Sequence, residues 1–543
     1  MKNRVMLAVW LAIISAIAAG LAGVSAQTQN GGSAAITPEL LRGWLTYISS
    51  DELQGRETFS EGLGLAAAYI ADQLKAAGVK PGGDRGSYFQ RVPVLGVNST
   101  NRSTVTVEVN GQSRTFKDGE GITFPVNAGG KRSFVLDQVE FVGYGLNLGT
   151  SWNDYKGLDV KGKAVVWLGN RPPRSINGRP ANSQIRSRDE IAIEEMGAMA
   201  AIAPPSESPA GVRRRTDPDF TTTERLDSPR PPALSATDSF LEFLFSASEA
   251  KYADLKARVD RQEDLAGFTL KGVKLKFNID ADYQVVRTQY TRNVVGIVEG
   301  SDARLKDTYV AFGGHYDHVG YQEGALSGGQ TDRIWNGADD DGSGTSTLIG
   351  LARAFSLGRR PKRSLLFVWH AGEEKGLWGS RYFADYPLVP LDRIVAQLNI
   401  DMVGRNANNN ESLSNTVLAV GADRISTELH NILIEADESL SRPLTIDFSM
   451  NDPADPERIY YRSDHYSYAA KGIPIIFFFT GLHPDYHQVT DTVDKIDFQK
   501  MARIAQLIYE TGSRLANLEH APARDFKGPR MGRGASGRIE TVQ

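Results

Sequence analysis

Several histidines and carboxylates in the second half of this chain have the types and spacing needed to bind metal ions. The chain contains no Cys, which excludes thiolate zinc sites and Cys nucleophiles, so any metal must be held by His, Asp and Glu. Two His and at least three carboxylates suit a pair of zinc ions that activates water for hydrolysis. In chain order the candidates are His315, Asp317, the run Asp339-Asp340-Asp341, Glu373, Glu374, Asp401 and His487.

A hydrolytic zinc pair needs three kinds of group. One carboxylate bridges two ions about 3.5–4 Å apart, each ion takes a further His and carboxylate, and one more carboxylate is left over as a base. The neighbours Glu373 and Glu374 can supply both a ligand and a base. No single one of these residues is decisive. A Glu pair is common at a helix start, and an Asp run before Gly342 also fits a helix cap or a calcium loop, although the full EF-hand pattern is absent.

Four apolar runs predict the strands that carry these residues, and helical patterns separate them. The predicted strands cover residues 309–312, 365–369, 395–400 and 473–479, and the helices cover 345–355, 377–385 and 425–440. Alternating strands and helices favour a largely parallel sheet, whose ligand site lies beyond the carboxyl ends of its strands. His315, Glu373 with Glu374, Asp401 and His487 each follow one of the four strands, so we expect them to converge at that edge.

Length and composition bound what the whole chain can be. With 543 residues, and roughly 150 residues per domain, we expect about three to four units. The hydrophobic fraction of 41% and the charged fraction of 23% are typical of a globular protein. The net charge is 61 − 65 = −4, which argues against a general nucleic-acid binder.

The first 26 residues are typical of a secretory signal peptide. Lys2 and Arg4 precede an apolar run over residues 5–24, and Val24-Ser25-Ala26 offers a small-residue cleavage site. We therefore expect a periplasmic or extracellular protein with no membrane span after cleavage; the alternative is a chain anchored through an uncleaved N-terminal segment. The Gly- and Arg-rich tail over residues 521–543 is predicted to be flexible.

Five motifs in the order found in one family resemble the di-zinc exopeptidases that include bacterial leucyl aminopeptidase, aminopeptidase Y and glutamate carboxypeptidase II. They cover residues 314–317, 336–344, 372–380, 399–402 and 486–492 and read GHYD, NGADDDGSG, GEEKGLWGS, NIDM and YHQVTDT. The last motif departs from the family, since Gln488-Val489 stands where Thr-Pro is usual, but that position is not a ligand.

The resemblance implies a role for each residue. His315 and Asp401 would bind one zinc, Glu374 and His487 the other, and Asp339 would bridge both, with a cis peptide bond often found after it. Glu373 would be the general base, and Asp317 would orient His315. The segment Arg462-Ser463-Asp464-His465 resembles a family segment near the substrate pocket, which makes His465 a candidate substrate-binding residue. His318 and His465 are set aside as ligands because the ligand set is complete without them.

Residues 136–274 resemble a protease-associated domain, which in the family is inserted beside the catalytic sheet and acts as a lid or a spacer. We therefore expect an α/β fold in which a largely parallel mixed sheet is flanked by helices and a smaller β-rich domain is inserted. The expected parts are the signal peptide 1–26, an N-terminal part of the catalytic domain 27–135, the protease-associated domain 136–274, the catalytic domain 275–520 and the tail 521–543.

The resemblance implies an exported two-zinc aminopeptidase that acts on peptides with a free amino terminus. The alternatives are a carboxypeptidase of the glutamate-releasing type, a glutaminyl cyclase, which uses a single zinc, and a non-catalytic receptor-like relative. Receptor-like relatives lose metal ligands, whereas every expected ligand and the base are present here.

Overall fold

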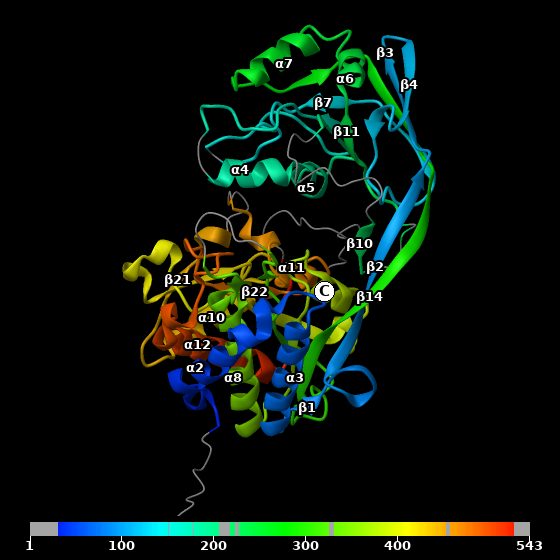
Figure 1. Ribbon diagram of the computed structural model, residues 1–543. Coiled ribbons are helices and arrows are strands. Elements are labelled where there is room, and N and C mark those ends of the chain that lie inside the picture. The colour runs from blue at the N-terminus through cyan, green and yellow to red at the C-terminus, as the bar shows by residue number, and fades with distance from the viewer. Residues whose placement is uncertain are drawn as a thin grey trace, which may run out of the picture.

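The computed structural model describes residues 31–149, 151–176, 179–205, 218–222, 226, 228–324, 331–451, 455 and 457–525. Within these residues the chain forms two lobes, each built on a ten-stranded sheet, as Figure 1 shows. The expected signal peptide and most of the expected tail lie outside the described residues. Among the residues described, none of the helices combines the length and the apolar character needed to cross a membrane.

The sheet of the first lobe is mixed, with a parallel centre. Its strands follow the order β10-β2-β14-β18-β15-β19-β22-β20-β21, and β1 pairs with β14. Strands β18, β15, β19 and β22 run parallel to one another, while β14 and β20 join this centre in antiparallel fashion. Their bounds are β1 (Lys80–Pro81), β2 (Phe89–Asn101), β10 (Asp219–Thr221), β14 (Ala281–Val298), β15 (Tyr309–His315), β18 (Ser364–His370), β19 (Ile394–Ile400), β20 (Thr416–Val420), β21 (Thr445–Asp447) and β22 (Ile475–Phe479).

The central strands are apolar at consecutive positions because helices cover both faces of the sheet. Phe312 and Phe367 point to one face, where they pack with helices α2, α3, α8, α10 and α12, and Ala311 and Leu366 point to the other, with α9 and α11. The helices are α2 (Pro38–Ile48), α3 (Glu61–Ala76), α8 (Gly344–Leu357), α9 (Trp378–Asp385), α10 (Thr427–Glu438), α11 (His465–Ala469) and α12 (Phe498–Asn517).

The second lobe has its own sheet, in the order β12-β7-β8-β9-β11-β5-β4-β3-β13-β6, and its own apolar core. Helices α4 and α5 lie on the side that faces the first lobe (Figure 1). Its strands are β3 (Thr104–Val109), β4 (Gln112–Asp118), β5 (Gly121–Thr123), β6 (Arg132–Leu136), β7 (Val139–Phe141), β8 (Ala164–Val166), β9 (Ala200–Ala203), β11 (Ala233–Ala236), β12 (Phe268–Leu270) and β13 (Val273–Ile279). Its helices are α4 (Arg179–Arg186), α5 (Arg188–Glu190), η4 (Ile191–Glu195), α6 (Asp238–Leu244) and α7 (Tyr252–Asp260).

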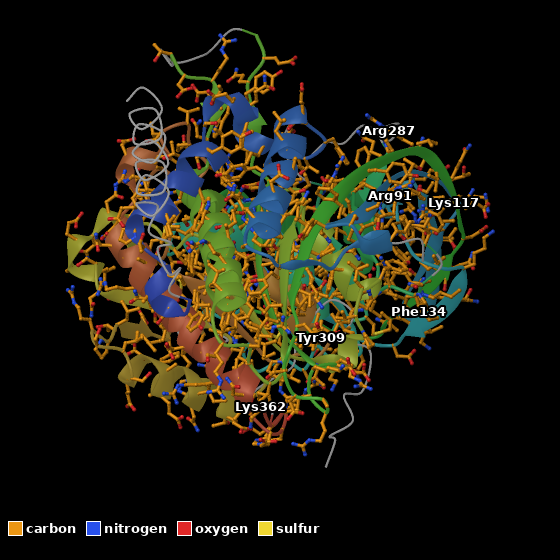
Figure 2. The ribbon with its side chains drawn as sticks, turned by 90° about the horizontal axis from the view of Figure 1, so that it is seen from below. Arg91, Lys117, Phe134, Arg287, Tyr309 and Lys362 are labelled. Carbon is orange, nitrogen blue, oxygen red and sulfur yellow. The ribbon has the colours of Figure 1, made fainter. Side chains whose placement is uncertain are left out.

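Two long strands join the lobes. β2 and β14 pair antiparallel from Phe89 opposite Val294 to Asn101 opposite Ala281 and run from one lobe to the other (Figure 1). In Figure 2, which views the molecule from below, Lys117 of β4 and Phe134 of β6 mark the second lobe, and Tyr309 at the start of β15 marks the first.

Short elements complete the described part of the chain. The two-stranded sheet consists of β16 (Gly320–Tyr321) and β17 (Ile334–Trp335). The short helices are η1 (Ser33–Ala35), η2 (Asp51–Arg56), η3 (Asp84–Gly86), η5 (Ala338–Ser343), η6 (Leu391–Arg393), η7 (Ala407–Asn409), η8 (Glu411–Leu413), η9 (Ser449–Asn451), η10 (Ile459–Tyr461) and η11 (Val493–Lys495).

Two expectations from the sequence differ from this architecture. Strands β3 to β6 belong to the second sheet, so the boundary between the sheets does not fall at residues 135 and 136 as expected. The reason is a non-local pairing: β13 lies between β3 and β6 and draws them into the second lobe. Residues 171–186 are rich in Pro, Arg, Ser and Asn, which predicts a loop, but α4 forms over Arg179–Arg186.

Candidate metal centre

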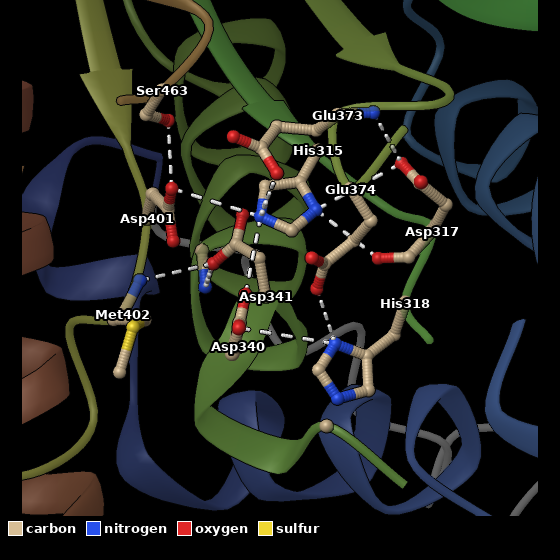
Figure 3. Close-up of polar contacts among 12 residues, drawn as sticks. His315, Asp317, His318, Asp340, Asp341, Glu373, Glu374, Asp401, Met402 and Ser463 are labelled. Atoms are coloured by element: carbon tan, nitrogen blue, oxygen red, sulfur yellow. Dashed lines mark hydrogen bonds and ion pairs between the residues drawn. The ribbon is translucent and has the colours of Figure 1, made fainter. Parts of the chain in front are cut away.

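The candidate residues meet at the carboxyl ends of the parallel strands. His315 is the last residue of β15, Asp401 directly follows β19, and Glu373 and Glu374 follow β18. His487 lies in the loop after β22. The sequence prediction that these five side chains converge at one edge of the sheet agrees with the structure, and Figure 3 shows most of them around the ring of His315.

Two groups of side chains could each hold a metal ion. The first group is His318, Asp340, Glu374 and His487, and the second is His315, Asp341 and Asp401; within each group the possible ligand atoms lie within 4.8 Å of one another. These donors are imidazole nitrogens and carboxylate oxygens, the set that zinc binds in the absence of Cys.

The carboxylate of Asp340 connects the two groups. One of its oxygens, Oδ1, lies 3.3 Å from Nε2 of His315. The other, Oδ2, lies 3.0 Å from Nε2 of His487, yet it is buried and has no hydrogen-bond partner. A buried carboxylate oxygen that faces an imidazole nitrogen without a hydrogen bond fits a position where both are ligands of the same ion.

This geometry corrects the bridge expected at Asp339. Oδ1 of Asp339 accepts a hydrogen bond from the Gly404 amide at 2.7 Å, and Oδ2 lies 3.2 Å from Nε2 of His483, so neither oxygen belongs to a candidate metal group. It is Asp340 that faces both His315 and His487, and the backbone leaves helical geometry at this residue, with φ −101° and ψ 100°. The cis peptide bond is also one residue later than expected, between Asp340 and Asp341.

Asp341 is tied to the backbone around it. Its Oδ1 accepts hydrogen bonds from the amides of Gly344 at 2.8 Å and Met402 at 3.2 Å, which fixes the start of α8 against the end of β19. Burial raises the pKa of Asp341 well above its usual range. Its second oxygen, Oδ2, is buried without a hydrogen-bond partner.

Glu373 and Glu374 have different surroundings although they are neighbours. Glu374 contacts Nδ1 of His318 at 2.8 Å and Nε2 of His487 at 3.1 Å. Burial alone would raise the pKa of Glu374, but these two histidines lower it to about 2. Glu373 belongs to neither candidate metal group and lies 4.0 Å from Nε2 of His315; burial raises its pKa well above the usual range.

Asp317 contacts His315 through its backbone. Its carbonyl oxygen lies 3.1 Å from Nδ1 of His315, whereas its carboxylate is 3.9 Å from that atom. The carboxylate instead accepts hydrogen bonds from the Thr58 hydroxyl and from the Glu373 amide, each at 3.1 Å. Asp317 therefore positions the backbone of Glu373 as well as the ring of His315.

His465 does not lie where the sequence prediction placed it. The side chain is fully buried, its Nε2 lies 2.7 Å from the Tyr460 carbonyl oxygen, and its ring stacks on Phe477 at 4.4 Å. Burial lowers the pKa of His465 to about 3. It is a core residue next to the pocket wall and not a lining residue.

A pocket opens beside Asp340, His315, Glu373 and Asp401. Its other lining side chains are mostly apolar or aromatic: Met402, Ile459, Phe477, Phe479, Leu482 and Tyr486, together with Arg462 and Ser463. Ser463 donates a hydrogen bond to Oδ2 of Asp401 at 2.7 Å, so the pocket wall also supports a candidate ligand (Figure 3).

Sequence reasoning missed several residues that hold the centre in place. Arg56 is fully buried and donates to the carbonyls of Ile48, Tyr316, Asn336 and Gly337 at 2.5–3.0 Å. Asp491 accepts hydrogen bonds from the amides of Asp339 and Asp340. Asp491 stands in a recognised motif, but Arg56 lies in an ordinary polar stretch with no signal of its own. His318 is also present in a candidate group, although the sequence analysis set it aside.

Comparison with known proteins agrees with this geometry. Residues 293–512 match peptidase family M28. The matched segment holds every member of both candidate metal groups.

Curated relatives are similar over part of their length. A "Probable leucine aminopeptidase" of Arthroderma benhamiae is 28% identical over 225 residues, which are 40% of this chain and 55% of the relative. A "Probable zinc metalloprotease" of Pyrenophora tritici-repentis is 26% identical over 274 residues, 42% of this chain and 58% of the relative. The chain therefore spans about half the length of these relatives. Among solved structures, an aminopeptidase from Aneurinibacillus sp. is 18% identical with a TM-score of 0.46 and covers 93% of this chain and 100% of its own.

Proposed function

We propose that this protein is a zinc-dependent aminopeptidase that uses two zinc ions. The position of Asp340 carries the proposal, because its two oxygens face His315 at 3.3 Å and His487 at 3.0 Å and so join two groups of ligands. The names of the curated relatives, leucine aminopeptidase and zinc metalloprotease, support the same activity.

In this proposal each ion has its own ligands. His315 and Asp401 would hold one zinc, Glu374 and His487 would hold the other, and Asp340 would be shared by both groups. Nδ1 of His318, 2.8 Å from Glu374, donates to that carboxylate and orients it. Zinc bound there would lower the pKa of a water ligand and polarise the carbonyl of the scissile bond.

Glu373 acts as the general base. It has no place in the ligand groups, lines the pocket and lies beside His315, so its carboxylate can reach a water molecule at the centre. Glu373 accepts a proton from that water and returns it to the amine of the leaving peptide. The amide of Glu373 is held by the Asp317 carboxylate at 3.1 Å, which limits the positions its side chain can take.

The pocket lining favours an aminopeptidase over a carboxypeptidase that releases glutamate. Among the described residues that line it, Arg462 is the only Lys or Arg, and its guanidinium already pairs with Glu457 at 3.2 Å. Met402, Ile459, Phe477 and Leu482 offer apolar contacts to the side chain of an N-terminal residue such as leucine. The carboxylates beside the pocket favour the positively charged amino terminus of a peptide.

Substrate blocking tests the proposed activity. The zinc-loaded protein should hydrolyse leucyl-p-nitroanilide and should not hydrolyse N-acetyl-leucyl-p-nitroanilide, because acetylation removes the charged amino terminus. Preferential cleavage of N-blocked dipeptides that end in glutamate would contradict the proposal and favour the carboxypeptidase.

We also propose that the protein is exported and that its signal peptide is removed. The support is the apolar run over residues 5–24 followed by Val24-Ser25-Ala26. N-terminal sequencing of the protein from its host should start at Gln27. A chain that begins at Met1 and stays in the membrane fraction would favour the uncleaved anchor.

A further inference from the structure

The segment over residues 457–463 forms one wall of the pocket beside the metal centre. Ile459, Arg462 and Ser463 from this segment line the pocket. Asp455 closes the turn before them, since its carboxylate accepts a hydrogen bond from the Ile459 amide at 2.9 Å and its carbonyl accepts one from the Arg458 amide at 3.0 Å. The position of this turn therefore sets the shape of the wall.

Arg458, within this turn, contacts the second lobe. Its guanidinium pairs with Glu195 of η4 and lies 3.7 Å from a carboxylate oxygen of Glu190 in α5. The side chains of Arg458 and Glu195 are only 10% and 6% exposed, so their ion pair is buried between the lobes. Arg458 also has a φ of 53°, a left-handed conformation that a residue other than Gly keeps only when its surroundings hold it.

The other charged side chains around this pair have partners of their own. Arg424 donates to the Asn451 carbonyl at 2.8–3.0 Å and stacks over the ring of Tyr460 at 4.0 Å. Glu457 pairs with Arg462 at 3.2 Å. Within the described residues of this wall, Arg458 is thus the cation that pairs with carboxylates of the second lobe.

We propose that the Glu195–Arg458 pair positions the wall of the substrate pocket, so that the second lobe contributes to selection of the N-terminal side chain. This inference rests on the proposed aminopeptidase function. Glu195 and Arg458 do not line the pocket and act as positioning residues through Ile459 and Arg462. Because loss of one partner leaves a buried charge uncompensated, the turn is expected to shift or loosen when either residue is neutralised.

Steady-state kinetics of Glu195→Gln, Arg458→Met and the double variant test the proposal. Each single variant should raise KM for leucyl-p-nitroanilide roughly tenfold, with kcat within about twofold of wild type, and the double variant should be no worse than the singles because the residues act as one pair. KM for glycyl-p-nitroanilide should change less than about twofold, because glycine has no side chain to contact the wall. Arg458→Lys keeps the charge and should recover most of the leucyl KM.

Glu140→Gln is the matched control. Glu140 also makes a buried ion pair, with Lys163 at 2.9 Å, but both residues belong to the second lobe. This variant should affect the stability of that lobe and leave KM for both substrates unchanged. An equal rise in leucyl KM in Glu140→Gln would show that any weakening of the lobe has this effect and would overturn the assignment.

Hydrogen exchange gives a readout that does not depend on activity. Amides of residues 457–463 should exchange faster in Glu195→Gln and Arg458→Met than in wild type or Glu140→Gln. Faster exchange in a protein that cleaves no aminoacyl substrate would support the positioning contact while contradicting the aminopeptidase function. Unchanged exchange together with unchanged leucyl KM would overturn the inference.

Discussion

Glu373 and Glu374 show how position, and not residue type, separates a base from a ligand. The two carboxylates are adjacent, yet Glu374 contacts two histidines at 2.8 and 3.1 Å, while Glu373 stays outside both candidate metal groups. The motif around them led to the same assignment through the family resemblance. The sequence alone left the two interchangeable, because nothing in a Glu-Glu pair tells which side chain faces the histidines.

Substitution of each Glu by Gln should separate the two roles. Glu373→Gln keeps the shape and removes the proton acceptor, so the rate should fall by roughly 10²–10⁴-fold while the zinc content stays as in wild type. Glu374→Gln should lose zinc during dialysis and regain part of its activity when zinc is added. The measurements are kcat with leucyl-p-nitroanilide and metal analysis of the same samples. Near-full activity of Glu373→Gln would contradict its role as base.

The sequence does not show which of the three Asp residues at 339–341 faces both candidate metal groups. The motif led us to expect the bridging carboxylate at Asp339, one residue before Asp340. Asp339 faces the Gly404 amide and His483, whereas Asp340 faces His315 and His487. Three identical residues in a row carry no pattern that distinguishes them, and the folded backbone, which leaves helical geometry at Asp340 and Asp341, gives each side chain a different direction.

The variants Asp340→Asn and Asp339→Asn form a matched pair. Asp340→Asn should reduce the binding of both zinc ions, because this side chain alone faces both groups. Asp339→Asn should keep the zinc content of wild type and lower stability, because it changes a buried side chain that holds the Gly404 amide and faces His483. Metal analysis after dialysis and urea unfolding measure the two effects. Loss of zinc from Asp339→Asn with retention in Asp340→Asn would restore the assignment that the sequence suggested.

At the scale of elements, apolar runs predicted the central strands well. The runs at 309–312, 365–369 and 395–400 correspond to β15, β18 and β19, each longer by a few residues at one or both ends. Runs of this kind are informative because strands buried on both faces are apolar at every position. The pairing of β13 with β3 and β6 was not predictable, because these contacts join segments more than a hundred residues apart in sequence.

The role of Arg56, a single residue that connects several elements, was likewise not predictable from the sequence. Its guanidinium satisfies carbonyls from α2, from the end of β15 and from the loop before η5, so it fixes three segments that surround the metal centre. Burial lowers the pKa of Arg56 to about 10. No periodicity or motif marks it, because its importance comes from contacts made only in the folded chain.

Arg56→Met should destabilise the first lobe by about 2–4 kcal/mol, since it leaves several buried carbonyls without a donor. Urea unfolding measures this loss. Lys75→Met, at an exposed position in the last turn of α3, is the control and should change the free energy of unfolding by less than about 0.5 kcal/mol. Equal stability of Arg56→Met and Lys75→Met would contradict the structural role given to Arg56.

Both backbone pairing and side-chain contacts connect the two lobes in the described part of the chain. The β2–β14 ladder connects them through the backbone, and the Glu195–Arg458 pair connects them through buried side chains next to the pocket. The metal centre itself draws all its candidate ligands from the first lobe. The second lobe can therefore influence which substrate binds without taking part in metal binding.

We propose that two zinc ions share the Asp340 carboxylate, and calorimetric titration of zinc into metal-free protein measures how many ions bind and which residues they need. Chelator-treated wild-type protein should bind two zinc ions per chain and regain leucyl-p-nitroanilide hydrolysis as the sites fill, whereas Asp340→Asn should show weakened binding at both sites. Full activity with saturation at one zinc per chain, or two intact zinc sites in Asp340→Asn, would contradict the claim.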